Sequence, residues 1–505
     1  MRTITVKRTG VTLHPDRKRV LLRPFHLMSD QRAIHICSEV AALPESKVRA
    51  LLEQILAEFG ERHQQMREFF RRRFDEVRPY LLKEPKDGES FRRRSDDVLP
   101  SGVTGEHLSE ERELLLGAYF SHEYSLEAAA LFNPSIVVHP EQSGVAPGSL
   151  RFVLSLRATG EGHVSSVTFR TGALDSQCNI SIDEPSRYCL EPAPVPNATY
   201  DRRQFERKLS ELGLEGGFSQ RILKALEDPF TLDELVSSIS VAVRQLRVPS
   251  LETEAIGRKI LALARSNYQV EFAPDSRLSE RVLFPATPSQ SNGIEDARFV
   301  LFQDEDGTRT YYATYTAYDG RTVQPQFLET SDFLHFKFIT LSGAAVKNKG
   351  MALFPRKING KYAMLGRQDA ENIYLMCSDH LHFWHDTQIV LKPSFPWEII
   401  QLGNCGSPIE TKAGWLVISH GVGPMRKYCI GAFLLDRDNP AKVIGRLPEP
   451  LITPDENERE GYVPNVVYSC GSLVHGRQLI IPYGMSDYAT TFATVPLDQV
   501  LAGME

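Results

Sequence analysis

Two adjacent acidic residues, Glu295 and Asp296, stand where a polar loop becomes an apolar strand. They belong to the stretch Asn292-Gly-Ile-Glu-Asp-Ala-Arg298, which runs directly into Phe299-Val-Leu-Phe302. A carboxyl group can donate or accept a proton, and a carboxylate accepts hydrogen bonds from hydroxyl groups. Acids at the start of a strand also commonly cap a turn. The pair is therefore a candidate for acid chemistry. Whether it has that role depends on the groups that the fold brings near it.

Basic side chains recur at one place in the pattern, the end of the second strand of a predicted hairpin. The set consists of Arg157, Arg367 and His420, to which Lys349 and Arg426 can be added. A guanidinium group offers a fork of donors suited to phosphate or carboxylate, so these residues predict an oxyanion pocket. The alternative is a ring of ion pairs that closes a central channel. Carboxylates that could hold sugar-like hydroxyls or donate a proton follow the same strand ends at Asp319, Asp369 and Asp487.

A fivefold repeat must position these side chains. Five times the chain runs from an apolar strand through a glycine-bearing turn to a second strand that ends in polar residues. The predicted first and second strands are 135–138 and 152–156, 298–302 and 311–315, 352–354 and 362–365, 408–410 and 415–418, and 466–468 and 479–481. The turn glycines 307, 360, 414 and 476 are 53, 54 and 62 residues apart, which is the length of a four-stranded propeller blade. The repeat predicts a mainly β fold, a five-bladed β-propeller whose loops converge on one site.

Helical patterns interrupt and precede the propeller. Apolar residues at helical spacing predict four helices near 203–212, 220–227, 232–246 and 252–265, an insertion between the first and second blades. Two more helices are predicted between Pro44 and Leu81, and another from Ser109 to about Leu131, whereas residues 1–43 suggest strand and loop. We therefore predict a largely helical N-terminal region at 1–131, blade one at 132–185, the helical insertion at 186–275 and blades two to five at 276–505. The two helical parts could form one lobe and support a homo-oligomer.

Composition narrows the class of protein. The 505 residues are 42% hydrophobic and carry a formal net charge of -6, so no overall basic charge points to nucleic acid as a partner. The seven cysteines are scattered and form no C-x-x-C pair, so we expect reduced thiols and neither a metal site nor a bound cofactor. The first residues lack the apolar core of a secretory signal, and no stretch approaches the roughly 18 apolar residues of a membrane span. We expect a cytoplasmic protein without a membrane partner.

Four ordered stretches resemble the signature sequences of glycoside hydrolase family 130, the β-mannoside phosphorylases and β-1,2-mannosidases. They are Asn292–Arg298, Ala352–Arg367, Ser419–Val422 and Glu460–Asn465, and the resemblance covers roughly residues 130–500 without the insertion. It implies a five-bladed propeller that phosphorolyses β-mannosides with inversion, most plausibly β-1,2-linked mannooligosaccharides, to α-mannose 1-phosphate. Inorganic phosphate would be the co-substrate, and no other cofactor is implied.

The resemblance also implies roles for single residues. Asp296 would be the catalytic acid, protonating the glycosidic oxygen through the 3-hydroxyl of the mannosyl unit while phosphate attacks the anomeric carbon from the opposite face. Arg157, Arg367 and His420 would bind phosphate with Lys349 and Arg426. The predicted substrate-binding residues are Asn292, Glu295, Arg298, Tyr318, Asp369, Tyr462 and Asp487. The sequence departs from the family pattern at Gly350-Met351, where an acidic residue is expected beside Lys349, and at Gly366.

Other functions stay open at this point. A β-1,2-mannosidase would need a base opposite Asp296, for which Glu161, Asp369 and Glu460 are candidates. A mannosyltransferase could run the reaction backwards, although no P-loop or G-x-G-x-x-G motif for a nucleotide is present. A carbohydrate-binding propeller without activity would have no use for a phosphate pocket.

Overall fold

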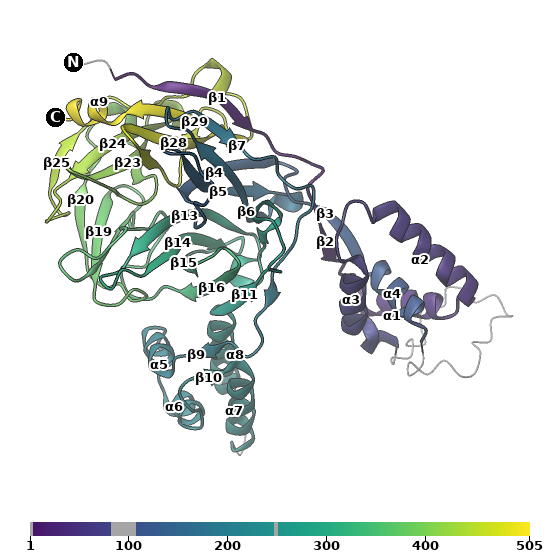
Figure 1. The fold of residues 1–505 in the computed structure, drawn as a ribbon. Helices are drawn as coiled ribbons and strands as arrows, with labels where there is room; N and C mark the ends of the chain where they lie inside the picture. The colour runs from purple at the N-terminus through teal and green to yellow at the C-terminus, as the bar shows by residue number, and fades with distance from the viewer. Residues whose placement is uncertain (1–3, 82–107, 247–250) are drawn as a thin grey trace. The chain divides into compact units, whose positions relative to one another are not determined.

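The computed structural model describes residues 4–81, 108–246 and 251–505 (Figure 1). The chain divides into two compact units. The larger unit comprises the residues up to Asp16, Glu127–Ser186 and Leu190–Glu505, and the smaller unit comprises Arg17–Leu126 with Arg187–Cys189.

Five groups of mainly antiparallel strands follow one another along the larger unit. The first group consists of β4 (Ala130–Val138), β5 (Leu150–Thr159), β6 (Ser165–Leu174), β7 (Ile180–Ile182) and β12 (Val282–Leu283). The second consists of β13 (Gly293–Gln303), β14 (Arg309–Tyr318), β15 (Val323–Thr330), β16 (His335–Thr340), β11 (Tyr268–Glu271) and β8 (Ala193–Pro194). A parallel pairing of Gly293 with Ser165 joins these two groups into one sheet.

The remaining three groups form separate sheets. The third group consists of β17 (Ala352–Leu353), β18 (Tyr362–Gly366), β19 (Ile373–Ser378) and β20 (Thr387–Leu391). The fourth consists of β21 (Gln401–Asn404), β22 (Ile409–Thr411), β23 (Gly414–Val422), β24 (Tyr428–Leu435) and β25 (Val443–Arg446). The fifth consists of β26 (Val467–Tyr468), β27 (Leu473–His475), β28 (Gln478–Met485) and β29 (Ala489–Pro496), and β1 (Lys7–Leu13) from the start of the chain pairs with β29. Helix α9 (Leu497–Ala502) follows.

The predicted hairpins are present, with one difference. The four turn glycines all adopt a positive φ, as hairpin turns require. In the fifth hairpin, however, the strand before Gly476 is β27, whereas the predicted residues 466–468 contribute β26, which pairs with the other end of β28.

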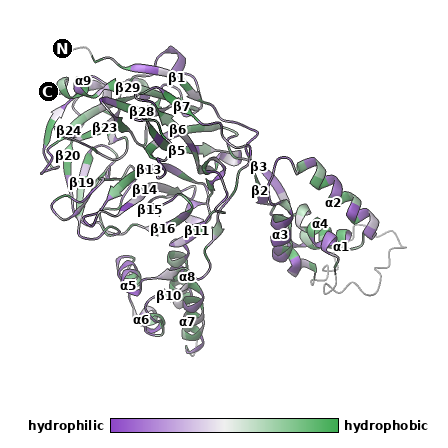
Figure 2. Ribbon diagram, in the orientation of Figure 1, coloured by the Kyte–Doolittle hydropathy of each residue, from purple (hydrophilic) through white to green (hydrophobic). Residues whose placement is uncertain are grey.

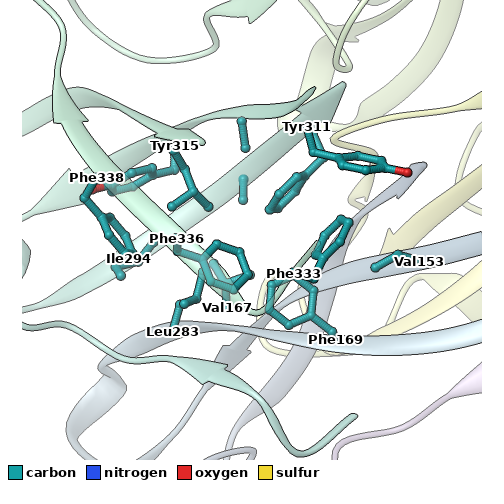
Figure 3. Packing of buried hydrophobic residues seen from close by; sticks show 14 of the residues in the cluster. Val153, Val167, Phe169, Leu283, Ile294, Tyr311, Tyr315, Phe333, Phe336 and Phe338 are labelled. Atoms are coloured by element: carbon teal, nitrogen blue, oxygen red, sulfur yellow. The ribbon is translucent and has the colours of Figure 1, made fainter. Parts of the chain in front are cut away.

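Apolar clusters lie between successive groups of strands. Between the first two groups, Phe169 packs edge-on against Phe333 with ring centroids 5.7 Å apart (Figure 3). Similar clusters join the second group to the third, the third to the fourth and the fourth to the fifth. The fifth group also contacts the first, since the Thr490 hydroxyl donates to the Leu131 carbonyl at 3.0 Å and the Phe152 and Phe492 rings are 6.4 Å apart. Burial of these strands on both faces explains their nearly continuous apolar runs.

The helical insertion lies between β8 and β11. It contains β9 (Thr199–Tyr200), α5 (Arg202–Glu211), α6 (Gly217–Lys224), β10 (Phe230–Thr231), α7 (Leu232–Arg244) and α8 (Leu251–Arg265). These are the four helices that the apolar spacing predicts. In Figure 2 apolar and polar residues alternate along α7, and the apolar face packs into a core that includes Leu235, Ile222 and Ile260. Thr231 and Glu234 form a capping box at the start of α7.

In its described residues the smaller unit combines one antiparallel pair of strands, distant in sequence, with four helices. Its elements are β2 (Val20–Pro24), α1 (Asp30–Ala41), α2 (Glu45–Phe59), α3 (Met66–Leu81), α4 (Glu110–Tyr119) and β3 (Ser121–Ser125). Buried Arg112 of α4 donates to the carbonyls of Val40, Ala41 and Leu43, and so satisfies the free carbonyls at the end of α1.

Two predictions for the first 131 residues are wrong. Residues 30–41 form α1 instead of strand or loop, because buried Ala33, Ile34, Cys37 and Val40 lie at helical spacing. The helix that starts after Ser109 ends at Tyr119, and the residues from Ala130 already belong to β4. No helix in the described part of the chain is long and apolar enough to span a membrane.

Candidate active site

A bulge in β13 presents the acidic pair. The pairing of β13 with β14 shifts register between Glu295 and Arg298, and Asp296 within the bulge has a φ of 52°. The pairing of β4 with β5 shifts in the same way between Phe132 and Ser135, where Asn133 has a φ of 49°. Asp and Asn tolerate this left-handed conformation better than most residues. The two bulges bring these side chains together, and the Asn133 amide Nδ2 donates to Asp296 Oδ1 at 2.7 Å.

Arg157 binds both acids from β5. Its Nη2 donates to Glu295 Oε1 at 2.7 Å, and its Nη1 donates to Asp296 Oδ1 at 3.3 Å. The Arg157 Nε donates to Ser165 Oγ at 2.9 Å, which fixes the plane of the guanidinium group. Lys349 Nζ lies 3.9 Å from Glu295 Oε2. The structure thus brings four predicted residues into one cluster, with Asp296 nearly buried at 5% exposure.

The charges around Asp296 and Asp487 drive their pKa values apart. Burial alone would raise the pKa of Asp296, but the positive charges of Arg157, Lys349 and Arg298 outweigh it and hold the pKa well below its usual range. Burial and the negative charge of Asp296 instead raise the pKa of Asp487 to about 6. Two carboxyl groups in different protonation states near pH 5 are an arrangement that can divide acid and base roles.

Arg367, directly after β18, and His420 of β23 form a second cluster. The Arg367 Nη1 donates to His420 Nε2 at 3.1 Å, so the imidazole proton resides on Nδ1, which lies 3.8 Å from Cys405 Sγ. Burial, and then the positive charge of Arg367, holds the pKa of His420 well below its usual value, so the ring is neutral. The buried Arg367 Nε has no hydrogen-bond partner among the described residues, which leaves a donor for a bound anion.

A chain of contacts connects the two clusters. Arg298 Nη1 donates to the Asp296 carbonyl at 3.0 Å, and its Nη2 donates to the Tyr468 hydroxyl at 2.6 Å. The Tyr468 ring in turn lies 4.8 Å from the His420 ring, centroid to centroid. Arg298 is buried beneath the acids, so its contacts position them.

Gly403 on β21 permits the close approach of the second cluster. A Cβ at this position would lie 2.4 Å from His420 Cε1 and 3.3 Å from Arg367 Cδ. No residue larger than glycine fits there without moving the imidazole. The requirement explains a glycine inside a strand, where it otherwise weakens the sheet.

Arg426 and Tyr462 lie at exposed positions around these clusters. The guanidinium group of Arg426 is 5.9 Å from the Tyr428 ring, and its positive charge acts on Asp487. The Tyr462 ring is 57% exposed and stacks on His163 with centroids 5.5 Å apart. The backbone N–H of Val463, the residue after Tyr462, donates to the carbonyl of Ser486, the residue before Asp487.

Several predicted residues are engaged elsewhere. The Asp369 carboxylate accepts from the backbone N–H groups of Glu371 and Asn372 and from the Tyr374 hydroxyl, so it caps its own turn. Asp319 does the same for the turn that contains Arg321. The Tyr318 hydroxyl donates to the Gly320 carbonyl at 3.0 Å, and exposed Asn292 donates its backbone N–H to the Tyr318 carbonyl. Among the described residues, none of these side chains forms a hydrogen bond with Asp296 or Arg367.

Sequence reasoning missed Asn133, Ser165 and Tyr468. The predicted site assigns no role to Asn133. A signal was present, because Phe132-Asn-Pro-Ser135 and Glu295-Asp-Ala-Arg298 occupy equivalent places before the first hairpin strand of consecutive repeats. In the described residues no group of three or more His, Cys, Asp or Glu side chains is arranged to hold a metal ion.

Comparison with known proteins identifies related sequences. Residues 250–505 match the model of glycoside hydrolase family 130, described as beta-1,4-mannooligosaccharide phosphorylase. A 1,2-beta-oligomannan phosphorylase of Thermoanaerobacter sp. (strain X514) is 38% identical over 232 residues, which cover 44% of this chain and 75% of that protein. A beta-1,2-mannobiose phosphorylase of Listeria innocua serovar 6a is 29% identical over 253 residues, 48% of this chain and 68% of that protein.

Solved structures include similar chains. The beta-1,2-mannobiose phosphorylase of Listeria innocua, in complex with beta-1,2-mannobiose, aligns with a TM-score of 0.44 and 22% identity over 74% of this chain and 92% of that one. The family model and the curated relatives define the class as carbohydrate-active enzymes. The chain belongs to glycoside hydrolase family 130.

Proposed function

We propose that this enzyme is an inverting phosphorylase of β-mannosides, which converts β-1,2-linked mannooligosaccharides and phosphate to α-mannose 1-phosphate and a shortened chain. The observation that carries the proposal is a single buried carboxylate, Asp296, surrounded by cationic side chains with free donor capacity. The names of the relatives from Thermoanaerobacter and Listeria support the β-1,2 linkage.

The phosphate site comprises Arg367, His420 and Lys349, with Arg157 and Arg426 beside it. Neutral His420 accepts from Arg367 Nη1 without repelling the guanidinium charge and so orients it, and the unpaired Arg367 Nε faces no competing protein acceptor among the described residues. An anionic nucleophile needs to be placed by cations and does not need a base to activate it. With phosphate as the nucleophile, one carboxylate that acts as the acid therefore suffices for catalysis.

Asp296 donates the proton to the leaving oxygen through the 3-hydroxyl of the mannosyl unit, as the family resemblance implies. The C1–oxygen bond of the substrate breaks, a C1–oxygen bond to phosphate forms, and the proton of the attacking hydrogen phosphate balances the proton that the leaving group receives. In the free enzyme Arg157 and Lys349 keep the pKa of Asp296 low. A bound phosphate anion offsets those charges and raises the pKa of Asp296, so the acid form is favoured only when the co-substrate is present.

The residues beside Asp296 and the phosphate site bind the sugar. Asp487 has a pKa raised to about 6 and can therefore donate as well as accept hydrogen bonds to hydroxyls near neutral pH. Exposed Tyr462, stacked on His163, offers an aromatic face to the acceptor sugar. Glu295 shares Arg157 and Lys349 with the site, and Arg298 acts from beneath Asp296. Asn292, Tyr318 and Asp369 are held by their own turns, so their proposed contacts with sugar are indirect.

We also propose that the five groups of strands are blades of one propeller. Support comes from the apolar clusters between each group and the next and from the contacts of the fifth group with the first. In this arrangement the polar ends of β5, β14, β18, β23 and β28 meet around one centre. The joining of the insertion with the N-terminal helices into one lobe stays a prediction.

The proposal is tested by the phosphate dependence of cleavage. Purified protein is incubated with β-1,2-mannobiose with and without inorganic phosphate, and mannose and mannose 1-phosphate are quantified. We expect cleavage only with phosphate. Equal release of mannose without phosphate would show a β-1,2-mannosidase, and binding of the disaccharide without turnover would show a carbohydrate-binding protein.

A further inference from the structure

A partly polar cavity lies between α5 of the helical insertion and strands β11 and β16. Its volume is about 100 Å³, and its lining includes Gln204 and Lys208 of α5, Asn267 before β11, and Lys337 of β16. None of the residues around Asp296 or Arg367 lines it. Glycosidic chemistry at Asp296 has no need of this cavity.

The ammonium group of Lys208 is buried with little compensation. Lys208 is only 4% exposed, and among the described residues its ammonium group donates one hydrogen bond, to Asn267 Oδ1 at 2.7 Å. That oxygen is shared, because it also accepts the backbone N–H of Thr340 at 2.9 Å. An ammonium group has three donors, so at least one of the Lys208 donors can serve a ligand in the cavity.

The carboxylates near Lys208 are committed to other groups. Glu211 lies 3.2 Å from His385, and Asp201, which also lines the cavity, accepts the backbone N–H of Gln204 as the cap of α5. Lys337 adds a second positive charge from the opposite wall. A buried ammonium without a paired anion is costly, and a polar cavity beside it indicates that the anion comes from solution.

The electrostatics of the surrounding groups favour a bound anion. Burial, and then the charge of Lys337, lowers the pKa of Lys208 to about 7. Burial and the charges of both lysines lower the pKa of His382 to about 3, and its buried Nε2 has no hydrogen-bond partner within the described residues. Lys208, Lys337 and His382 thus bring three nitrogen groups into one region.

We propose that this cavity is an oxyanion-binding site that holds inorganic phosphate or a phosphate monoester between α5 and strands β11 and β16. Lys208 and Lys337 supply the charge, and Gln204 and Asn267 supply neutral polar contacts. A ligand there links the insertion to the strand group that carries Asp296, since β16 and β13 belong to the same sheet. The proposed class of ligand follows from the two cations and does not depend on the reaction at Asp296.

The test counts bound phosphate by equilibrium dialysis of the intact protein with radiolabelled inorganic phosphate. We expect two equivalents for the wild type, one for Arg367→Ala, one for Lys208→Met and none for the double variant. If the enzyme were a hydrolase without a catalytic phosphate site, the wild type would bind one equivalent that Lys208→Met removes and Arg367→Ala retains. Failure of the proposed function is therefore distinguishable from failure of this site. Phosphate binding that Lys208→Met leaves unchanged would overturn the proposal.

A second variant tests the same site independently of whether Lys208→Met folds. In Gln204→Glu a carboxylate four residues before Lys208 on α5 can pair with the ammonium and replace the ligand. We expect this variant to fold and to lose one equivalent of phosphate, whereas Lys224→Met, at an exposed lysine of α6, should retain both. Competition with α-mannose 1-phosphate distinguishes the source: displacement from the Arg367→Ala protein indicates a sugar phosphate site, and no displacement indicates inorganic phosphate. Retention of the equivalent in Gln204→Glu would contradict the site.

Discussion

Substitution of Gly403 by alanine tests the geometry of the phosphate site without removing any of its polar groups. The added Cβ would lie 2.4 Å from His420 Cε1 and 2.9 Å from Nε2, well inside van der Waals contact. His420 cannot simply turn away, because its ring stacks on Tyr428 at 6.0 Å and contacts Tyr468 at 4.8 Å. The imidazole must therefore leave its hydrogen bond with Arg367, which lies on the same side of Gly403.

The size of the effect follows from that hydrogen bond. A hydrogen bond to a charged group contributes about 1.5–3 kcal/mol, and about 1.4 kcal/mol corresponds to a factor of ten. We expect kcat/KM for phosphate to fall by about 10- to 100-fold in Gly403→Ala. Overpacking should cost a further ~1–3 kcal/mol of folding stability, so the protein stays folded if its total stability is ordinary.

The assay is steady-state phosphorolysis of β-1,2-mannobiose at varied phosphate, together with thermal unfolding. Gly217→Ala provides the matched control, because a Cβ at Gly217 of α6 meets no atom within 4 Å. That variant should keep the wild-type KM for phosphate. Unchanged kcat/KM for phosphate in a folded Gly403→Ala enzyme would refute the assignment of Arg367 and His420 to the phosphate site.

Three further predictions concern the carboxylates. Asp296→Asn should lower kcat by about 10²–10⁴ while phosphate still binds in dialysis, because the variant loses only the proton donor; a variant of normal rate would exclude Asp296 as the acid. Asn133→Ala should lower kcat by about tenfold or more with little change in KM for phosphate, since it removes the 2.7 Å hydrogen bond that orients Asp296; a change confined to KM would assign Asn133 to binding. For Asp487 the pKa of about 6 in the folded protein exceeds the usual value of 3.8, so its contribution to stability is full below the lower pKa and is lost as pH rises through the higher one. The wild type should therefore lose stability relative to Asp487→Asn as the pH rises from about 4 to about 6. A difference in unfolding free energy between the two proteins that does not depend on pH would contradict the raised pKa.

The sequence predicts local structure well where local rules decide it. The four insertion helices follow from apolar spacing, and the turn glycines mark hairpins because a positive φ is needed there. The first helix was missed because Asp30–Ala41 mixes charged and apolar residues, and only its buried face identifies it.

Part of the site could be predicted, because some of its residues are adjacent in sequence or occupy equivalent positions of the repeat. Glu295 and Asp296 are adjacent in sequence, and Arg157 and Arg367 occupy matching strand ends, so their approach could be expected from the repeat. The hydrogen bond between Asn133 and Asp296 spans 163 residues and depends on two bulges, so it could be anticipated only by aligning the equivalent positions of consecutive repeats. Asp369 is a carboxylate at a strand end, as expected of a sugar-binding residue, but in the structure its side chain caps its own turn.

The most direct test of the central claim follows one reaction of β-1,2-mannobiose with phosphate by ³¹P and ¹H NMR. If Asp296 acts as the single acid and the Arg367 cluster places phosphate, the phosphate signal should decrease one for one with the appearance of mannose 1-phosphate, in the α configuration from the first turnover. Accumulation of free mannose from both halves of the disaccharide, with the phosphate signal unchanged, would contradict the account.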